Sequence, residues 1–473
     1  MTLHATVKMV FTTPLAFLMW GICAGALALL RVIRFLRGGA ADTRSALVVS
    51  WEFPPCASTG VHLPASIVRH AHDAGWHVQV VCGPAPRNVS AGGEDLARLV
   101  PSGVEVARVP RALADDGQVH FHPAWTIPSI DGGFLAALAM AVTAAIVFFR
   151  SPPALVIGSG PRFANFAAAR RLASVFGAKL LLQYRDEWTV NTPDFVTATR
   201  FDRAEELRCL TRADVVSFVS DGKRTAYCRG FPHIDPAKFI TTPNGWEPYF
   251  HDRARLDTNH LPKESGTFAL TYTGRYHRSL ASLLQSCDNL LARRPDLARL
   301  RLIFVGEQLP DNKRLIADFA RRHPKTVIDL PATAPTTAIE VQRESSALLL
   351  VNDHVYDGVV PLKTFDYLRS GQPILVFGQT GGAAEIVDRL DAGVTVPAGD
   401  DQALETALTR LMSSNRPWDT PARKSWCERH NRRELVMEML AAAAASLDSS
   451  QPERGTLPED PCEAEVSPRA IPL

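Results

Sequence analysis

A lysine and an aspartate lie three positions apart in the segment "GVVPLKTFDYLRSGQPILVFG". The pattern predicts a helix that carries Lys363 and Asp366 on one face and ends at Gly371, because glycine tolerates the left-handed turn after a helix. Lys363 would stand at the helix start, where backbone amides attract phosphate. Asp366 could accept two hydroxyl hydrogen bonds from a ribose or a hexose. The alternative is an exposed ion pair worth about a few tenths of a kcal/mol.

Two short glycine loops precede this segment. The strand-like run "TYT" ends at Gly274, and the run "IFV" ends at Gly306. Glycine lets a backbone approach a ligand closely. Arg275 and Arg278 follow the first loop, and their forked donors suit the oxygens of a diphosphate. Two such loops, followed in order by the helix with Lys363, favour a ligand site more strongly than a single glycine does.

A second group of polar residues follows strand-like runs in the first half of the chain. Ser58, Thr59 and Gly60 precede a helix whose amides would favour an anionic or hydroxyl-rich ligand, with a plain helix cap as the alternative. Arg185 and Asp186 stand where the run "KLLLQY" becomes a loop. Asp186 could act as a base or orient an acceptor hydroxyl, whereas a buried Arg185–Asp186 pair would only fix the loop.

An Asn-Gly pair begins at Asn244, just before a polar stretch that we interpret as a linker. Gly245 can adopt positive φ at little cost. The pair is expected at the crossover between two domains, close to a ligand. A plain turn without a ligand is the alternative.

The elements that would position these residues alternate between strands and helices. Near-continuous apolar runs are typical of parallel strands covered on both faces. Such runs recur at 46–51, 77–82, 104–109, 154–158, 179–184 and 214–220, and again at 268–274, 301–306, 326–330, 347–351 and 373–377. The pattern predicts an α/β fold of two doubly wound, Rossmann-like domains, with ligands at the carboxyl ends of the strands.

The predicted organisation has six parts, which follow from these two series and from the shifts in composition. They are an anchor with a basic flank (1–43), an N-terminal Rossmann-like domain (44–246), a linker (247–266), a C-terminal Rossmann-like domain (267–400), C-terminal helices (401–446) and a disordered tail (447–473). The tail is rich in proline and charge and has little to bury.

The N-terminal segment 9–30 carries no charge and is long enough to cross a bilayer of about 30 Å. Arg31, Arg34 and Arg37 follow it, and the positive-inside rule then puts the bulk of the chain in the cytoplasm. We therefore expect a single-pass transmembrane helix in the cytoplasmic membrane, with a cleaved signal peptide as the alternative. A second uncharged run, 132–149, is expected as a buried or membrane-apposed helix, and a second span is its alternative.

The composition is that of a globular protein. Of the 473 residues, 46% are hydrophobic and 21% are charged. The net charge of +2 gives no reason to expect nucleic acid as a partner. The eight cysteines show no metal-binding spacing and are expected as reduced thiols.

Taken together, seven segments resemble the family 4-type glycosyltransferases of the GT-B fold. They occur in the family's order over roughly residues 44–400, and the helix with Lys363 is the most specific of them. The segments are "FPPCASTGVHLPASIVRHAHDAGWHVQVV", "YRDEWTVNTPDF", "ADVVSFVS", "NGWEPYF", "LTYTGRYHRS", "LIFVGE" and "GVVPLKTFDYLRSGQPILVFG". The resemblance implies transfer of a sugar from a nucleotide-sugar, bound by the C-terminal domain, to an acceptor bound by the N-terminal domain, with retained configuration. It also implies a final helix, within 401–446, that crosses back to the first domain.

The resemblance further implies a role for each candidate residue. Asp186, Arg275 and Lys363 would be catalytic; Gly274, Arg278, Gly306, Gly358, Pro361 and Asp366 would bind the donor; Ser58, Thr59, Gly60, Arg185 and Asn244 would line the acceptor side of a cleft. No metal or other cofactor is expected, because the chain has no Asp-x-Asp motif. The N-terminal segment favours a membrane-proximal acceptor, either lipid-linked or a glycan, in the assembly of a surface polysaccharide or glycoconjugate.

Four positions depart from the family pattern. The family commonly has glutamate at the position of Asp366, an acidic residue at Gly358, a lysine after Gly274 and an arginine at His62. These departures keep open a catalytically degenerate scaffold of the same fold. A nucleotide-sugar 2-epimerase, which shares the fold, is a further alternative, but its chain would be expected to lack the anchor.

Overall fold

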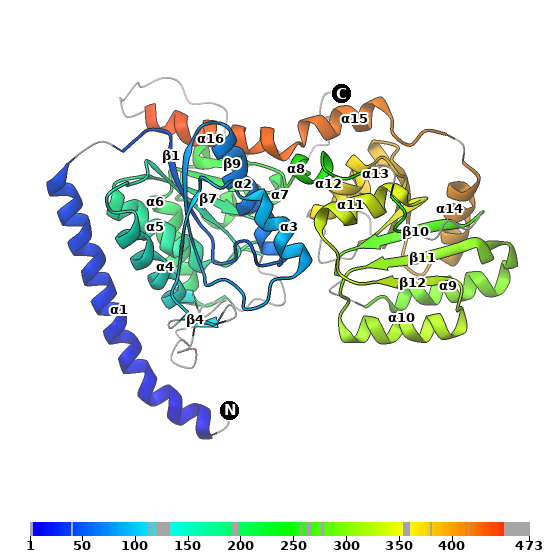
Figure 1. Ribbon diagram of the computed structural model, residues 1–473, viewed down its shortest axis with the longest axis horizontal. Coiled ribbons are helices and arrows are strands. Elements are labelled where there is room, and N and C mark those ends of the chain that lie inside the picture. The colour runs from blue at the N-terminus through cyan, green and yellow to red at the C-terminus, as the bar shows by residue number, and fades with distance from the viewer. Residues whose placement is uncertain are drawn as a thin grey trace. The chain divides into compact units, whose positions relative to one another are not determined.

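The computed structural model describes residues 3–38, 41–111, 114–115, 118–119, 133–191, 198–255, 258–261, 266–275, 279–352, 360–378, 381–414 and 416–448. The chain divides into two compact units (Figure 1). The first unit holds the described residues up to Pro243 and those from Leu435 onward, and the second holds Asn244–Glu434.

The first unit is built on a seven-stranded parallel sheet with the strand order β3-β2-β1-β6-β7-β8-β9. Its strands are β1 (Ser45–Val49), β2 (His77–Cys82), β3 (Glu105–Arg108), β6 (Leu155–Ser159), β7 (Lys179–Tyr184), β8 (Val215–Phe218) and β9 (Phe239–Thr241). The central strands are buried along their whole length, which explains their continuous apolar runs. A separate antiparallel pair joins β4 (Ala114–Asp115) to β5 (Gln118–Val119).

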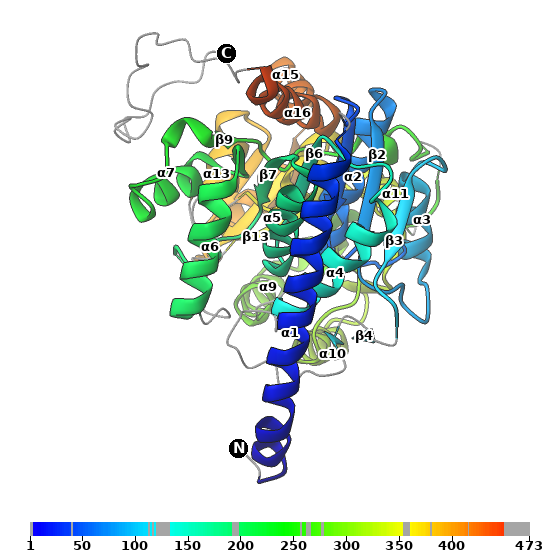
Figure 2. The same ribbon diagram turned by 90° about the vertical axis from the view of Figure 1, so that its left-hand side faces the viewer.

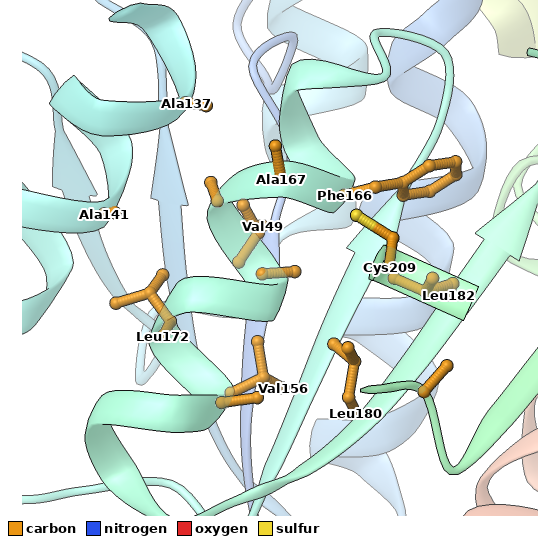
Figure 3. Packing of buried hydrophobic residues seen from close by; sticks show 14 of the residues in the cluster. Val49, Ala137, Ala141, Val156, Phe166, Ala167, Leu172, Leu180, Leu182 and Cys209 are labelled. Atoms are coloured by element: carbon orange, nitrogen blue, oxygen red, sulfur yellow. The ribbon is translucent and has the colours of Figure 1, made fainter. Parts of the chain in front are cut away.

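The helices of the first unit follow its strands in alternation. They are α1 (Leu3–Arg37), α2 (His62–Asp73), α3 (Ala91–Leu99), α4 (Gly133–Val147), α5 (Ala164–Phe176), α6 (Arg200–Arg212) and α7 (Asp221–Gly230), with short 3-10 turns at Thr59–Val61 and Pro236–Lys238. α16 (Arg432–Asp448) starts in the second unit and belongs to the first from Leu435 onward. Leu180 and Leu182 of β7 meet Phe166 of α5 and Cys209 of α6 in one hydrophobic core (Figure 3).

The second unit repeats the architecture with a six-stranded parallel sheet in the order β12-β11-β10-β13-β14-β15. The strands are β10 (Phe268–Thr273), β11 (Leu300–Val305), β12 (Val327–Leu330), β13 (Ala347–Asn352), β14 (Ile374–Gly378) and β15 (Gly393–Val396). The helices are α8 (Pro248–His251), α9 (Ala281–Arg293), α10 (Pro310–Arg322), α11 (Pro335–Glu344), α12 (Leu362–Ser370), α13 (Gly382–Arg389), α14 (Asp401–Ser413) and α15 (Pro421–Arg429), with a 3-10 turn at Pro295–Arg299.

The predicted pair of doubly wound, Rossmann-like α/β units is confirmed. The prediction of a membrane-spanning helix at 9–30 is not confirmed. Segment 9–30 lies within α1, and among the residues that the structure describes no helix is long and apolar enough to cross a membrane. The segment 132–149 contains α4, which packs against α5 in the core of the first unit. The part of the predicted tail from residue 449 onward lies outside the described residues.

Candidate active site

Helix α12 is fixed at its C-terminal end by a buried arginine. The helix stops at Gly371, which has a φ of 86° as the sequence predicts for a C-cap glycine. Arg423 of α15 donates from Nε to the carbonyl of Leu368 at 2.8 Å and from Nη2 to the carbonyls of Tyr367 and Gln372 at 2.8 and 2.9 Å. These bonds satisfy carbonyls that a helix end leaves unpaired. Burial lowers the pKa of Arg423 to about 10, so its charge persists at neutral pH.

Lys363 is the second residue of α12, and its ammonium meets an aromatic ring rather than a carboxylate. Its Nζ donates to the phenol oxygen of Tyr272 in β10 and lies 3.7 Å from the centroid of the same ring. Nζ also points toward Gly274, where an added Cβ would lie 3.7 Å away. The residue as a whole is half-buried, and burial lowers the pKa of Lys363 to about 7. In the described part of the chain no carboxylate pairs with this ammonium.

Asp366 does not pair with Lys363, so the alternative of an exposed ion pair on α12 is wrong. The Oδ1 of Asp366 lies 3.2 Å from Nε2 of His251, the last residue of α8. His251 is 3% exposed and lies edge-on to the ring of Trp246 at 5.2 Å between centroids. Burial lowers the pKa of His251, although Asp366 opposes this shift. The carboxylate of Asp366 keeps a partly exposed side, from which it can accept further hydrogen bonds.

The two predicted glycine loops lie directly against each other. Gly274 and Gly306 have φ values of 93° and 130°, which favour glycine. A Cβ at Gly306 would lie 3.1 Å from the carbonyl of Gly274, so the close approach also requires glycine there. Gln308 donates from Nε2 to the carbonyl of Gly274 at 2.8 Å. Arg275 donates to the carbonyl oxygen of Glu307 at 3.0 Å and has a half-exposed side chain.

The loop before α12 is held by the Asn-Gly pair of the sequence. Asn244 donates from Nδ2 to the carbonyl of Val360 at 3.4 Å, beside Pro361, the N-cap residue of α12. Gly245 has the positive φ that was predicted, at 65°. Buried Arg432 donates to the carbonyls of Asn244 and Gly245 at 2.9 and 2.7 Å. Asn244 therefore belongs to the second unit, next to the helix that carries Lys363.

Two of the predicted donor-binding residues, Arg278 and Gly358, lie outside the described residues. The other predicted donor-binding residues all belong to the second unit, as do two of the predicted catalytic residues, Arg275 and Lys363. These donor-binding residues are Gly274, Gly306, Pro361 and Asp366, of which the two glycines directly follow β10 and β11.

In the first unit, Arg185 connects three loops at the carboxyl end of the sheet. Its guanidinium donates to the carbonyls of Thr59, Gly160 and Pro161, the last at 3.0 Å. Thr59 begins the turn before α2, and Gly160 and Pro161 follow β6. Arg185 therefore positions the loop that contains Ser58, Thr59 and Gly60.

The carboxylates that follow β7 are held by a lysine that the sequence reasoning missed. Lys223 of α7 is 4% exposed. Its Nζ lies 2.9 Å from Oε2 of Glu187 and 3.8 Å from Oδ1 of Asp186, and it donates to the carbonyl of Arg185. The side chain of Asp186 is 46% exposed and that of Glu187 only 13%. Glu187 therefore neutralises Lys223 inside the protein, and Asp186 reaches solvent.

A buried aromatic network supports the same loop from behind. The backbone N–H of Trp188 donates to the phenol oxygen of Tyr227 at 2.9 Å, and Tyr227 donates to Oε1 of Glu206 at 2.7 Å. Tyr184 contacts the same carboxyl oxygen at 3.2 Å. Burial raises the pKa of Glu206 to about 7.

Glu52, three residues after the end of β1, is a second residue that the sequence reasoning missed. Ser58 begins the short turn before α2, yet its hydroxyl caps no backbone amide and donates instead to Glu52. Gly60 leaves room for that carboxylate, because a Cβ there would overlap it. Arg162 lies 3.7 Å from the other oxygen of Glu52. The helix-cap alternative for Ser58 is therefore wrong, and a carboxylate stands among the predicted acceptor-side residues.

Comparison with known proteins agrees with this geometry. Residues 267–414 match a family model described as Glycosyl transferases group 1. This segment contains the two glycine loops and α12, and most of the second unit, without α8 and α15. Among curated protein sequences, none matches the chain.

Solved structures of glycosyltransferases share the fold. Sucrose-phosphate synthase from Thermosynechococcus elongatus is 15% identical over 86% of this chain and 99% of its own, with a TM-score of 0.60. An alpha,alpha-trehalose-phosphate synthase (UDP-forming) from Burkholderia vietnamiensis is 13% identical over 85% and 99%, with a TM-score of 0.61. HepE from Anabaena, solved in complex with UDP and glucose, is 14% identical over 85% and 99%, with a TM-score of 0.56. The fold is therefore that of GT-B glycosyltransferases, and the resemblance to family 4 in particular stays a prediction.

The two units thus offer different chemistry. The second presents an ammonium, a half-exposed guanidinium and backbone amides at the start of a helix, which together suit an anionic group such as a diphosphate. The first presents a solvent-accessible carboxylate on a rigid loop. Within the described ranges no cluster of His, Cys, Asp and Glu side chains could hold a metal ion. The expectation of a metal-independent reaction is not tested by that finding.

Proposed function

We propose that this protein is a glycosyltransferase that moves a sugar from a UDP-sugar to a membrane-proximal acceptor, either lipid-linked or a glycan, with retained configuration. The observation that carries the proposal is the ammonium of Lys363. It lies at the start of α12, beside Gly274, with a phenol and an aromatic ring as its partners. An ammonium removed from water gains most from an anion that binds it.

The donor would bind to the second unit. Lys363 and Arg275 would hold the diphosphate, and their positive charge would stabilise the departing nucleotide diphosphate, a task that a metal ion performs in other enzymes. Asp366, oriented by His251, would accept hydroxyl hydrogen bonds from the donor. The choice of UDP rests on the similar structures that contain UDP or form it.

The acceptor would use the first unit. Asp186 is the exposed carboxylate of its loop, and Lys223 and Arg185 hold that loop in place. It would lie nearest the reacting centre and would orient the acceptor hydroxyl or take its proton. The cytoplasmic side as the site of the reaction stays a prediction, which rests on the arginines after residue 30 and applies to a chain whose segment 9–30 spans the membrane.

Titration of the purified full-length protein with UDP, UDP-glucose, ADP and GDP tests this proposal. We expect UDP to raise the thermal midpoint, and Lys363→Ala to weaken its affinity at least about tenfold, or about 1.4 kcal/mol. Lys424→Ala is the matched control, because Lys424 is an exposed lysine of α15 in the same unit. Equal UDP affinity in both variants would remove Lys363 from the donor site.

A catalytically degenerate scaffold is the second candidate, and the short side chain of Asp366 is the observation that favours it. A scaffold would bind UDP without releasing it from any UDP-sugar. Release of UDP that needs an added acceptor identifies a transferase. A changed sugar without acceptor would identify the epimerase alternative.

A further inference from the structure

We propose that α1 and the end of α4 form a docking surface for an anionic lipid bilayer, with α1 lying along the membrane rather than through it. The inference rests on the proposed function only in placing the acceptor near a membrane. Its observations come from the first unit alone and do not involve the donor site.

Exposed apolar side chains are concentrated at this place. Of the twelve large hydrophobic residues that are exposed in the described part of the chain, nine belong to α1 or to the last turn of α4. Phe35 and Leu36 are 84% and 76% exposed, and Ile146 of α4 is 65% exposed. Clustered exposure of this kind marks a binding surface, whereas single exposed apolar residues are common on any protein.

The exposed residues of α1 form one stripe. Leu18, Ile22, Leu29, Val32 and Leu36 are exposed and follow each other at intervals of four, seven, three and four positions, which keeps them on one side of a helix. α1 runs beside α4 and α5 (Figure 2), and the exposed end of α4 lies near the end of α1, where Arg37 approaches Phe149.

The opposite side of α1 is covered by protein. Leu27 is 6% exposed and belongs to the core of the first unit, and Cys23 and Leu30 pack against the same core. A helix that spans a bilayer in isolation is surrounded by lipid on all sides over its apolar length. Over residues 23–30, α1 instead has one side in the protein core and one exposed apolar side, so the protein itself covers the side that does not face the lipid.

The charges around the stripe suit anionic lipid. Arg31 and Arg37 are exposed at the end of α1, and Arg150 is exposed just after α4. The guanidinium of Arg37 lies 5.4 Å from the ring centroid of Phe149, so basic and aromatic groups meet at the junction of the two helices. Neither helix contains an acidic residue. A second copy of this chain would bring the same arginines against each other, whereas a bilayer with anionic headgroups pairs with them.

Flotation of the full-length protein with vesicles tests the proposal. We expect binding to vesicles of equimolar phosphatidylcholine and phosphatidylglycerol, and much weaker binding to phosphatidylcholine alone or at high salt. The triple variant Ile22→Gln/Leu29→Gln/Leu36→Gln should lower the fraction bound at least about tenfold. Arg31→Gln/Arg37→Gln should remove the preference for the anionic lipid.

The control is the double variant Phe201→Gln/Leu207→Gln, which changes exposed apolar residues of α6 and should leave vesicle binding unchanged. UDP affinity is measured for every variant. Because the stripe is remote from Lys363 in sequence and belongs to the other unit, we expect UDP affinity to persist in the triple variant. Vesicle binding by a wild-type protein that does not bind UDP would contradict the proposed function but would support this inference.

Three results would overturn the inference. One is a wild-type protein that stays unbound to anionic vesicles. Another is a dimer that the triple variant converts to a monomer, since the stripe would then be an interface between copies. The third is resistance to alkaline carbonate extraction together with protection of the N-terminal residues from protease inside sealed vesicles, which would show a spanning helix. Release by carbonate, in contrast, supports a helix that lies in the interface.

Discussion

Lys223 and Lys363 occupy similar places in the two units but have opposite surroundings. Each belongs to the first turn of a helix that comes after a strand of a parallel sheet, α7 after β8 and α12 after β13. The helix dipole disfavours a cation at that end in both cases. Lys223 is compensated within the protein by Glu187 at 2.9 Å and by a backbone carbonyl. Lys363 contacts a phenol and its ring.

The difference separates a structural cation from one that suits a ligand. A buried ion pair with good geometry fixes a loop, and removal of one partner leaves the other charge uncompensated. An ammonium without a carboxylate partner contributes little to the stability of the fold. Binding of an anion stabilises such an ammonium. The same residue type therefore has two functions, and the surroundings of the side chain decide which one it has.

The largest expected effect is on folding and contrasts Lys223→Met with Lys363→Met. Lys223→Met should lower the free energy of unfolding by about 3–5 kcal/mol, because it leaves Glu187, whose side chain is only 13% exposed, without its partner. Lys363→Met should change it by less than about 1 kcal/mol in either direction, because it removes a desolvated cation from a helix start. Denaturant titration of both variants measures these values.

Lys179→Met is the control for this first contrast. Lys179 pairs with Asp214 at 3.1 Å, but both side chains are partly exposed. Its replacement should therefore lower the free energy of unfolding by less than about 1 kcal/mol. Equal losses of unfolding free energy in Lys223→Met and Lys363→Met would contradict the difference between the two lysines.

The next effect concerns the two carboxylates beside Lys223. Asp186→Asn should lower turnover by about 10²–10⁴-fold, as the loss of a group that assists proton transfer does, with the affinity for UDP nearly unchanged. The midpoint of thermal unfolding of Asp186→Asn should stay close to that of the wild type, because Asp186 lies 3.8 Å from Lys223 and is 46% exposed. Glu187→Gln should show the reverse pattern, with a lower midpoint. A marked fall in the midpoint of Asp186→Asn would instead make Asp186 a structural partner of Lys223.

A third effect follows from the pKa of Lys363. Burial holds this pKa at about 7, below its usual value, so the ammonium of the free protein loses its proton as the pH rises through that value. A diphosphate binds the protonated form. The affinity for UDP should therefore fall by up to about tenfold per pH unit above pH 7 and stay nearly constant below it. Isothermal titration between pH 6 and 9 measures the slope.

Lys363→Arg is the matched variant for the pH experiment, because the guanidinium stays charged over the whole range. Its affinity should show no such slope, whatever its absolute value. A slope that persists in Lys363→Arg would assign the pH dependence to another group.

The sequence was sufficient to predict the central strands and two of the four edge strands, β3 and β12. Buried strands such as β1 and β6 have continuous apolar runs, and each was expected. The sequence analysis missed β9 and β15, which lie at the ends of the two sheets. They are only three and four residues long, Phe239–Thr241 and Gly393–Val396, so neither contains an apolar run long enough to indicate a strand.

The site residues divide in a similar way. Gly274, Gly306 and Lys363 could be predicted because glycine after a strand and lysine at a helix start are local patterns. The partner of Asp366 could not, since His251 is 115 positions away in the sequence. Tyr272 precedes Lys363 by 91 positions, and nothing in either segment alone indicates their contact. Long-range partners of polar residues depend on how the helices pack, which a local pattern does not specify.

The smallest expected effect concerns that tyrosine and sharpens the description of Lys363. Tyr272→Phe removes the hydroxyl that accepts from Nζ and keeps the ring below the ammonium. Because phosphate oxygens would replace the lost acceptor in the complex, UDP affinity should fall by no more than about threefold, or about 0.6 kcal/mol. Tyr272→Leu also removes the ring and should cost more, since the cation–π contact is lost as well. Equal affinities for UDP in the two variants would mean that the ring contributes nothing, and that the hydroxyl alone positions the ammonium of Lys363 for the donor.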